Sequence, residues 1–445
     1  MTDTATGNIF DAAGALDPAA VAALGEEARA DRTRGVVRNA IAATSVNTVA
    51  LDRAVVTGMD HSVSHRVDGW AAANQKRSGR CWIFAGLNSL RGPVMAETGI
   101  EDLEFSQAYV HYWDKLEKAN HFLCAMAELA DRPLDDRTVE HLLTMPIDDG
   151  GQWNMFVALV EKYGVVPKYA MPETFSSSCT ESMNRDLETV LRRAALRVRA
   201  GIENAREDAL ADVHRILEIH LGTPPERFVW QYRTKEGRFH RGGEMTPQQF
   251  AGRYLPRDLG EYVCVVNDPR NGYGKLYTVE YLGNVVGGAP VTYLNAPMDV
   301  LRDAARNTIV AGRAVWFGCD TEVQCDADLG YWDEHLHDYE GVYGVDMGMS
   351  KRTRLEAAES LMTHAMVLVG ADVADDAHTV NRWRVENSWG TDTADRGFWT
   401  MNDNWFGEYV FEIAVHPRAL PQEYRDALGG DVTVLPAWDP MGALA

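Results

Sequence analysis

A glutamine six residues ahead of a cysteine, with a tryptophan and an apolar run directly behind that cysteine, constrains this chain most. The stretch begins at Gln75, and its apolar run reaches Phe84 and beyond. A run that is apolar on nearly every side is typical of a helix buried in a large protein, and Ser78-Gly79 can form the loop ahead of it. We therefore predict that Cys81 opens a buried helix, where the helix dipole lowers the thiol pKa and favours the nucleophilic thiolate.

The same stretch offers two donors for an oxyanion. The carboxamide of Gln75 and the backbone N–H of Cys81 can together form the hole that acyl transfer needs. A cysteine nucleophile also needs a base, and the base needs a group that orients it. The chain supplies His364 at the head of an apolar, strand-like run, and Asn387 followed by Ser388, Trp389 and Gly390.

In this order, the four motifs resemble the signatures of papain-like cysteine peptidases. The resemblance implies that Cys81 is the nucleophile and His364 the acid and base. It also implies that Asn387 orients the imidazole and that Gln75 completes the oxyanion hole. Two tryptophans support the site by the same resemblance: Trp82 follows the nucleophile, and Trp389 shields the hydrogen bond between asparagine and histidine.

One departure from that family bears on the compartment. Secreted members read Cys-Gly-Ser-Cys-Trp around the nucleophile, whereas this chain has Ser78 at the first cysteine position and Arg80 directly before Cys81. The missing cysteine removes half of a disulfide, which fits a reducing compartment. The six cysteines show no framework spacing, so we expect free thiols in a cytoplasmic protein.

The charge balance and composition exclude several classes. The formal net charge of −22 makes nucleic acid and anionic membrane surfaces poor partners. The chain has no secretory signal pattern and no apolar run long enough to span a membrane. Cys319 and Cys325 lack a second pair, and His111, His121 and His141 lack ligand spacing. We expect neither a metal nor a cofactor.

A pair of glycines and the C-terminal residues extend the resemblance. Gly150-Gly151 can pair with a substrate main chain as an added strand, although an ordinary loop is the alternative. The tail around Trp438 is apolar and small-residue-rich, unlike a disordered terminus. About 280 residues separate Cys81 from His364, against roughly 130–150 in ordinary papain relatives.

Together with Asn74-Gln75-Lys76, 114–120, 150–153, 315–320 and 438–442, these features resemble the bleomycin hydrolase / aminopeptidase C branch of the papain clan. The branch implies a homohexamer acting on peptides, with the C-terminal arm in each cleft. The Ala445 carboxylate would then pair with a substrate's α-ammonium. By the same resemblance, Thr363, Gly150 and Gly151 contact the substrate.

The predicted fold is α+β, a papain-like core of two halves with large insertions. We predict an N-terminal arm with a hook-like segment at 1–65 and a helical half with the nucleophile at 66–175. A helical insertion follows at 176–260, where apolar residues recur every three or four positions and Gly201 is the expected break. The β-rich half with His364 and Asn387 spans 261–435, and the C-terminal arm 436–445.

Three functions compete. The first is a cytoplasmic cysteine aminopeptidase gated by its own C-terminus. The second keeps the fold but makes the chain a broader endopeptidase, or an amidase of peptide-like drugs. The third is a non-catalytic binding protein with a relic site, against which the intact set of motifs and the acidic balance argue.

Overall fold

The computed structural model describes residues 9–443 and divides the chain into two compact units. The smaller unit comprises Met1–Met59 and His335–Gly348. It is helical: α1 (Pro18–Ala30), α2 (Arg32–Ala43), α3 (Val46–Ala50), α4 (Arg53–Thr57) and α15 (Tyr339–Tyr343). The first helix starts at Pro18, where the Asp17 side chain caps it by accepting a hydrogen bond from the Ala19 N–H.

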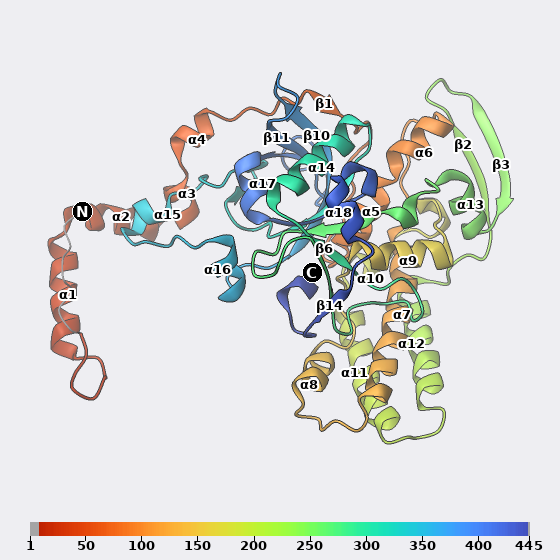
Figure 1. The fold of residues 1–445 in the computed structure, drawn as a ribbon, viewed down its shortest axis with the longest axis horizontal. Coiled ribbons are helices and arrows are strands. Elements are labelled where there is room, and N and C mark those ends of the chain that lie inside the picture. Colours follow the sequence, from red (N-terminus) through yellow and green to blue (C-terminus); the bar gives the residue numbers. More distant parts are fainter. Residues whose placement is uncertain (1–8, 444–445) are drawn as a thin grey trace. The chain divides into compact units, whose positions relative to one another are not determined.

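The larger unit, Asp60–Glu334 with Met349–Ala445, contains both halves of the predicted core. Its helical half begins with the helix that Cys81 opens and includes the long helix α7 (Figure 1). The helices and turns of this half are α5 (Cys81–Ser89), α6 (Arg91–Thr98), α7 (Gln107–Glu128), α8 (Arg137–Thr144), α9 (Trp153–Tyr163) and the 3₁₀ turn η1 (Lys168–Ala170).

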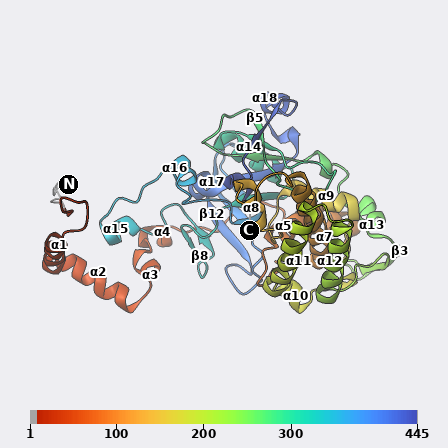
Figure 2. The same cartoon turned by 90° about the horizontal axis from the view of Figure 1, so that it is seen from below.

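The segment 176–260 is only partly the helical insertion that the periodicity predicts. Two long helices, α11 (Glu181–Arg199) and α12 (Ala205–Leu221), pack beside α7 in both views of the fold (Figure 1 and Figure 2). They break at Gly201, which has a positive φ of 67°, as predicted. A short helix, α10 (Phe175–Ser178), precedes them. The hairpin of β2 (Phe228–Arg233) and β3 (Phe239–Met245), followed by α13 (Pro247–Tyr254), was not predicted.

The β-rich half is one mixed, mainly antiparallel sheet in the order β14-β5-β6-β4-β13-β7-β10-β11-β12-β9-β8, with β1 added beside β10. Its strands are β1 (His65–Arg66), β4 (Val263–Val266), β5 (Lys275–Val279), β6 (Tyr293–Asn295), β7 (Val315–Cys319), β8 (Cys325–Asp326), β9 (Tyr331–Trp332), β10 (His364–Val373), β11 (Val380–Glu386), β12 (Phe398–Asn402), β13 (Val410–Val415) and β14 (Val432–Leu435). The remaining helices and turns are η2 (Leu259–Glu261), α14 (Met298–Val310), α16 (Lys351–Glu356), α17 (Asp403–Tyr409), η3 (Pro417–Ala419), α18 (Gln422–Ala427) and η4 (Pro440–Gly442).

The central strands of this sheet are buried on both faces, as β10 shows. Successive side chains of a strand point to opposite faces. Ala365 and Val367 join the apolar cluster that contains Cys81, whereas Met366 and Leu368 join the cluster beneath α14. The continuous apolar run behind His364 therefore reflects a strand covered on both sides. This packing places the first residue of β10 against α5.

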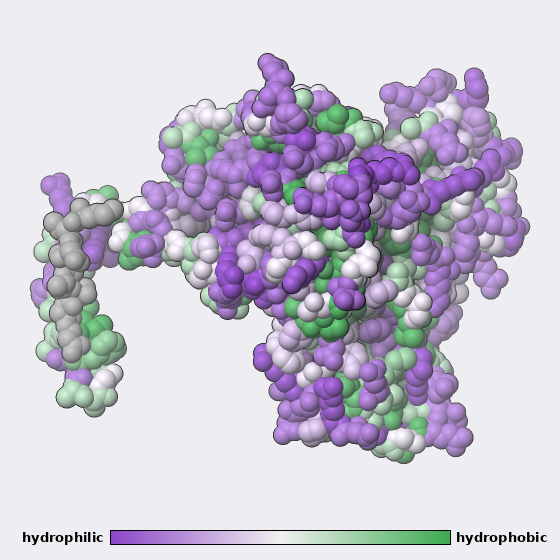
Figure 3. All heavy atoms as spheres, viewed as in Figure 1, coloured by the Kyte–Doolittle hydropathy of each residue, from purple (hydrophilic) through white to green (hydrophobic). Residues whose placement is uncertain are grey.

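The surface has the distribution expected of a protein in water. On the face shown in Figure 3, hydrophilic residues predominate on the larger unit, and hydrophobic residues form small separate patches. No helix within residues 9–443 combines the length and apolar character needed to cross the hydrocarbon core of a bilayer.

Candidate active site

Cys81 is the first residue of α5, as predicted, and its side chain is fully buried. The backbone N–H of Ala365 is hydrogen-bonded to the thiol, and Ala365 is the residue after His364. The start of α5 therefore lies against the start of β10. Two residues separated by most of the chain are brought to one place by the packing of a helix on a sheet.

The predicted lowering of the Cys81 pKa is wrong for this closed site. Burial raises the pKa of the thiol to about 12, opposed by hydrogen bonds from Ala365 and Trp82. Burial also lowers the pKa of His364 to about 4. Excluding water penalises each charged form more than the helix dipole favours the thiolate. Burial therefore favours the neutral thiol of Cys81 and the neutral imidazole of His364 in the resting site.

Hydrogen bonding fixes which nitrogen of His364 is free. Nε2 lies 2.9 Å from Oδ1 of Asn387, and the same oxygen accepts the N–H of Ser388 at 2.7 Å. Because Oδ1 only accepts, Nε2 must carry the proton and Nδ1 keeps its lone pair. The ring of Trp389 packs on the imidazole with centroids 5.2 Å apart, which keeps water from the bond between His364 and Asn387.

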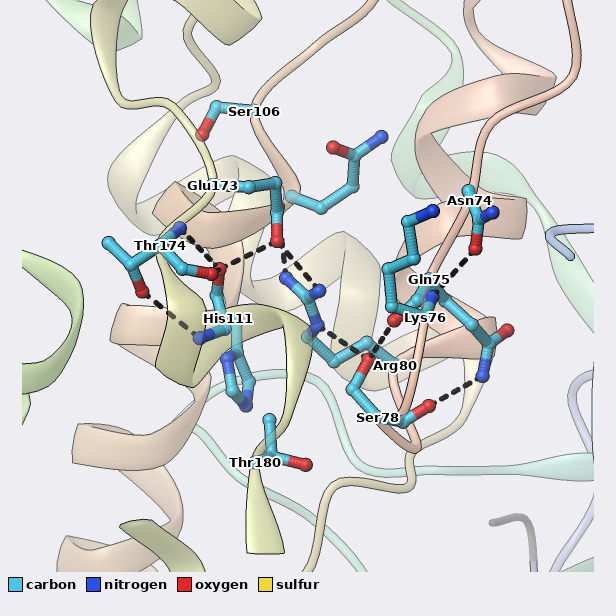
Figure 4. A network of polar contacts seen from close by, with 12 residues as sticks. Asn74, Gln75, Lys76, Ser78, Arg80, Ser106, His111, Glu173, Thr174 and Thr180 are labelled. Atoms are coloured by element: carbon cyan, nitrogen blue, oxygen red, sulfur yellow. Dashed lines mark hydrogen bonds and ion pairs between the residues drawn. The ribbon is translucent and has the colours of Figure 1, made fainter. Parts of the chain in front are cut away.

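Gln75 lies within the same buried cluster of polar groups. Its Nε2 donates to the carbonyl oxygen of Ser78 at 2.6 Å, and its Oε1 accepts the hydroxyl of Ser388 at 2.5 Å. Its backbone N–H also donates to the carbonyl of Ser388 at 2.8 Å. Gln75 is therefore joined directly to the residue after Asn387. The loop that carries it is drawn in Figure 4.

Gly150 and Gly151 make different kinds of contact. The carbonyl of Gly150 accepts a hydrogen bond from the ammonium of Lys118. A Cβ on Gly151 would lie 2.6 Å from an atom of the Trp82 indole, so only glycine fits there. Gly151 thus lets the chain pass directly over the indole of Trp82, the residue after Cys81.

Asp149 is a buried contact point that the sequence analysis missed. Its carboxylate accepts the N–H of Gly79 at 3.0 Å and the hydroxyl of Thr180 at 2.5 Å, and it lies 2.7 Å from the ammonium of Lys115. Although burial opposes ionisation, the charge of Lys115 holds the pKa of Asp149 well below its usual range. Its backbone carbonyl accepts the indole N–H of Trp82 at 2.6 Å. An acidic residue inside a glycine and tryptophan motif was the available signal.

Glu386 is a second missed residue, next to Asn387. Its carboxylate accepts hydrogen bonds from Trp70 at 2.8 Å and from Asn88 of α5 at 2.9 Å. Burial raises its pKa to about 7, opposed by Arg91. The end of β11 is therefore fastened to the helix that Cys81 opens. A single acidic residue at the end of an apolar strand gives no sequence signal for such a bond.

Thr363 is half-buried beside His364, and its N–H donates to the carbonyl of Cys319 at 2.9 Å. Ala445 lies outside the described residues, so its predicted contact with substrate is not described. All six cysteines are free thiols. Within residues 9–443, no cluster of histidine, cysteine and acidic side chains could hold a metal ion.

The C-terminal arm is fastened to both halves of the larger unit. Asp439 lies 2.8 Å from Arg270, and the hydroxyl of Tyr293 donates to the carbonyl of Met441 at 3.0 Å. On the helical side, the guanidinium of Arg137 lies 4.0 Å from the centre of the Trp438 ring. The arm thus runs between the half that carries Cys81 and the half that carries His364.

Comparisons with known proteins match nearly the whole chain to one family. A model of the Peptidase C1-like family matches residues 15–442. Bleomycin hydrolase of Gallus gallus is 44% identical over 416 residues, 89% of this chain and 91% of that protein. Aminopeptidase C of Listeria innocua is 40% identical over 418 residues, 92% of this chain and 93% of that protein. The crystal structure of PepW from Lactobacillus rhamnosis matches with a TM-score of 0.94 at 39% identity, covering 97% of this chain and 100% of that one.

Proposed function

Because the chain belongs to the Peptidase C1-like family, we propose that it is a cysteine aminopeptidase, which removes residues from the N-terminus of peptides. Membership makes the chain a cysteine peptidase and confirms the papain-like α+β fold. It also disfavours the third hypothesis, a non-catalytic binding protein. The observation that carries the proposal is the meeting of the Cys81 thiol with the start of β10, where Asn387 holds the imidazole of His364.

The chemistry follows from the neutral resting pair. Nδ1 of His364 takes the thiol proton as the sulfur attacks the scissile carbonyl, so a new C–S bond forms and the carbonyl oxygen becomes an oxyanion. The backbone N–H of Cys81, at the N-terminus of α5, donates to that oxyanion together with the carboxamide of Gln75. The imidazolium then protonates the leaving amine, and the C–N bond breaks.

Deacylation uses the same groups in reverse. His364 removes a proton from water as the water oxygen attacks the thioester, the C–S bond breaks, and the imidazolium returns its proton to the sulfur to regenerate the thiol. Gly151, whose neighbour's carbonyl is already used by Lys118, is the glycine proposed to pair with the substrate main chain. We propose that Thr363 borders the substrate beside His364.

The restriction to N-termini is assigned to the C-terminal arm. The contacts of Trp438, Asp439 and Met441 with both halves support a fixed course for the arm. In this proposal, the arm carries the Ala445 carboxylate to the α-ammonium of the substrate, and it blocks any chain that continues upstream.

Assembly and location complete the proposal. A homohexamer would give the smaller unit a role, because Leu16, Val21 and Val36 are exposed there and a neighbouring subunit could cover them. The six free thiols support a cytoplasmic location. The net charge of −22 continues to argue against nucleic acid as a partner.

The broader amidase remains the second candidate, because the bleomycin hydrolase of Gallus gallus is 44% identical to this chain. A panel of aminoacyl fluorogenic amides, free and N-acetylated, separates the two. We expect the intact chain to hydrolyse only the free amides and Cys81→Ala to hydrolyse none. Deletion of 441–445 should add hydrolysis of the N-acetylated amides. Equal rates on free and acetylated amides in the intact chain would remove the aminopeptidase assignment but leave the cysteine peptidase.

A further inference from the structure

The loop between Gln75 and Cys81 holds itself in one conformation. Nε2 of Gln75 donates to the Ser78 carbonyl, and the Ser78 hydroxyl donates back to the Gln75 carbonyl at 2.7 Å. The other end of the carboxamide accepts the hydroxyl of Ser388. These contacts fix which end of the amide is nitrogen, and they use one of its two hydrogens. The second N–H of the Gln75 amide can therefore donate a hydrogen bond to an oxyanion.

Ser78 is in turn held by Arg80. The guanidinium donates from Nε to the Ser78 hydroxyl at 2.9 Å, and its two terminal nitrogens donate to the two carboxylate oxygens of Glu173 at 3.0 and 2.8 Å (Figure 4). Glu173 also accepts the hydroxyl of Ser177 at 2.6 Å. The pair is anchored in α10, whose N-terminal Thr174 donates to a carbonyl at the end of α12.

Arg80 occupies an unfavourable place for a cation. Its side chain is fully buried, and it directly precedes the N-terminus of α5, where the helix dipole repels positive charge. Burying an arginine is costly unless a partner and hydrogen bonds compensate. The planar fork of arginine suits a carboxylate on one edge and a third acceptor at Nε, which a lysine cannot satisfy together. The three contacts of Arg80 therefore match the donor geometry of a guanidinium.

We propose that Arg80 and Glu173 are positioning residues for the oxyanion hole, acting through Ser78 on the amide of Gln75. The ion pair holds Arg80, which fixes the position of the Ser78 hydroxyl. The reciprocal hydrogen bonds between Ser78 and Gln75 then fix the position of the Gln75 amide nitrogen, the proposed oxyanion donor. In this chain, the pair ties down the loop at the position where secreted relatives have a cysteine. The inference rests on the proposed function, because an oxyanion forms only if Cys81 performs acyl transfer.

The charge of Arg80 is balanced by Glu173, so its effect on the thiol is geometric rather than electrostatic. Burial governs the pKa of Cys81, and the charge that acts on the thiol is that of Asp149. Alkylation of the thiol by iodoacetamide forms no oxyanion, whereas amide hydrolysis does. The two reactions therefore separate a fault in the oxyanion hole from a fault in the nucleophile.

The experiment compares Arg80→Lys, Gln75→Ala and the double variant in the full chain. We expect Gln75→Ala to lower kcat about 10²-fold or more, and Arg80→Lys to lower it about tenfold with KM within about twofold. Both singles should keep the parent rate of iodoacetamide alkylation at neutral pH. The double variant should be no slower than Gln75→Ala, because the two residues act as one unit. Arg302→Lys is the matched control, because Arg302 of α14 forms a partly buried ion pair with Asp403 of α17.

Two results would overturn the proposal. One is full additivity of Arg80→Lys and Gln75→Ala in kcat, and the other is a loss of alkylation in Arg80→Lys that parallels its loss of turnover. If Arg80→Lys fails to fold by circular dichroism and sizing, Glu173→Gln is measured against the same two criteria. Persistent turnover in Cys81→Ala would instead remove the proposed function, so the two failures are distinguishable.

Discussion

Removing the Trp389 ring should move the acid limb of the pH profile toward neutrality. Burial lowers the pKa of His364 from 6.5 to about 4, and the Trp389 ring lies against the imidazole. That shift corresponds to about 3 kcal/mol in favour of the neutral imidazole, the form that accepts the thiol proton. Trp389→Ala admits water, so it relieves part of this penalty and raises the pKa toward its ordinary value.

The assay is kcat/KM against pH for a free aminoacyl fluorogenic amide, since this ratio reports the ionisations of the free enzyme. We expect the acid limb of the parent near pH 4, and an upward shift of about 1–2 pH units in Trp389→Ala. Trp113→Ala, which removes a half-buried ring stacked on Tyr163, should leave the limb unmoved. A parent limb at about pH 6 or above, or an unshifted limb in Trp389→Ala, would refute the assignment of burial as the cause.

Three further predictions concern neighbouring features. Gly151→Ala places a Cβ 2.6 Å from the Trp82 indole and should cost about 2 kcal/mol in chemical denaturation, whereas Gly35→Ala, in open space, should cost little; equal costs would contradict the close approach. Burial raises the pKa of Glu412 to about 8, so its stabilising protonation is complete below the unfolded pKa near 4.5 and is lost as pH rises through 8. The free energy of unfolding of the parent should therefore fall by about 5 kcal/mol between pH 4.5 and pH 8 in urea melts, and Glu412→Gln should abolish this fall. The same dependence on pH in Glu412→Gln would contradict the prediction. Asp439→Asn weakens the ion pair with Arg270 and should raise turnover of N-acetylated amides relative to free ones. An unchanged ratio of the two turnover rates would show that this contact of the arm does not set specificity.

The sequence predicted those parts of the site that consist of contiguous motifs. Cys81 at the head of a buried helix and His364 at the head of a strand followed from apolar periodicity alone. Their meeting required the resemblance, because periodicity says nothing about which helix packs on which strand. The two helices broken at Gly201 were equally accessible, since both the spacing and the glycine are local features.

The missed features depend on contacts between distant segments. Asp149, Glu173 and Glu386 act through hydrogen bonds to partners far away in the sequence, so their surroundings were not visible beforehand. The thiol pKa was mispredicted for the same reason: the dipole of α5 is a local property, whereas the burial of Cys81 comes from the whole core. Burial alternates along the hairpin of β2 and β3, but the apolar residues Val229 and Phe239 lie on its exposed face, so the sequence itself shows no clear alternation of apolar and polar residues.

The edge strand β14 leads directly into the arm, and it pairs with β5 alone. Edge strands open at lower free energy than central ones, and neither Cys81 nor His364 lies on β14 or β5. In the proposed gating, fraying or clipping of the last fourteen residues, from Val432 onward, would leave Cys81 and His364 in place and would remove the restriction to N-termini. The proposal thus makes the same chain a selective enzyme with β14 paired and a more permissive one with β14 detached.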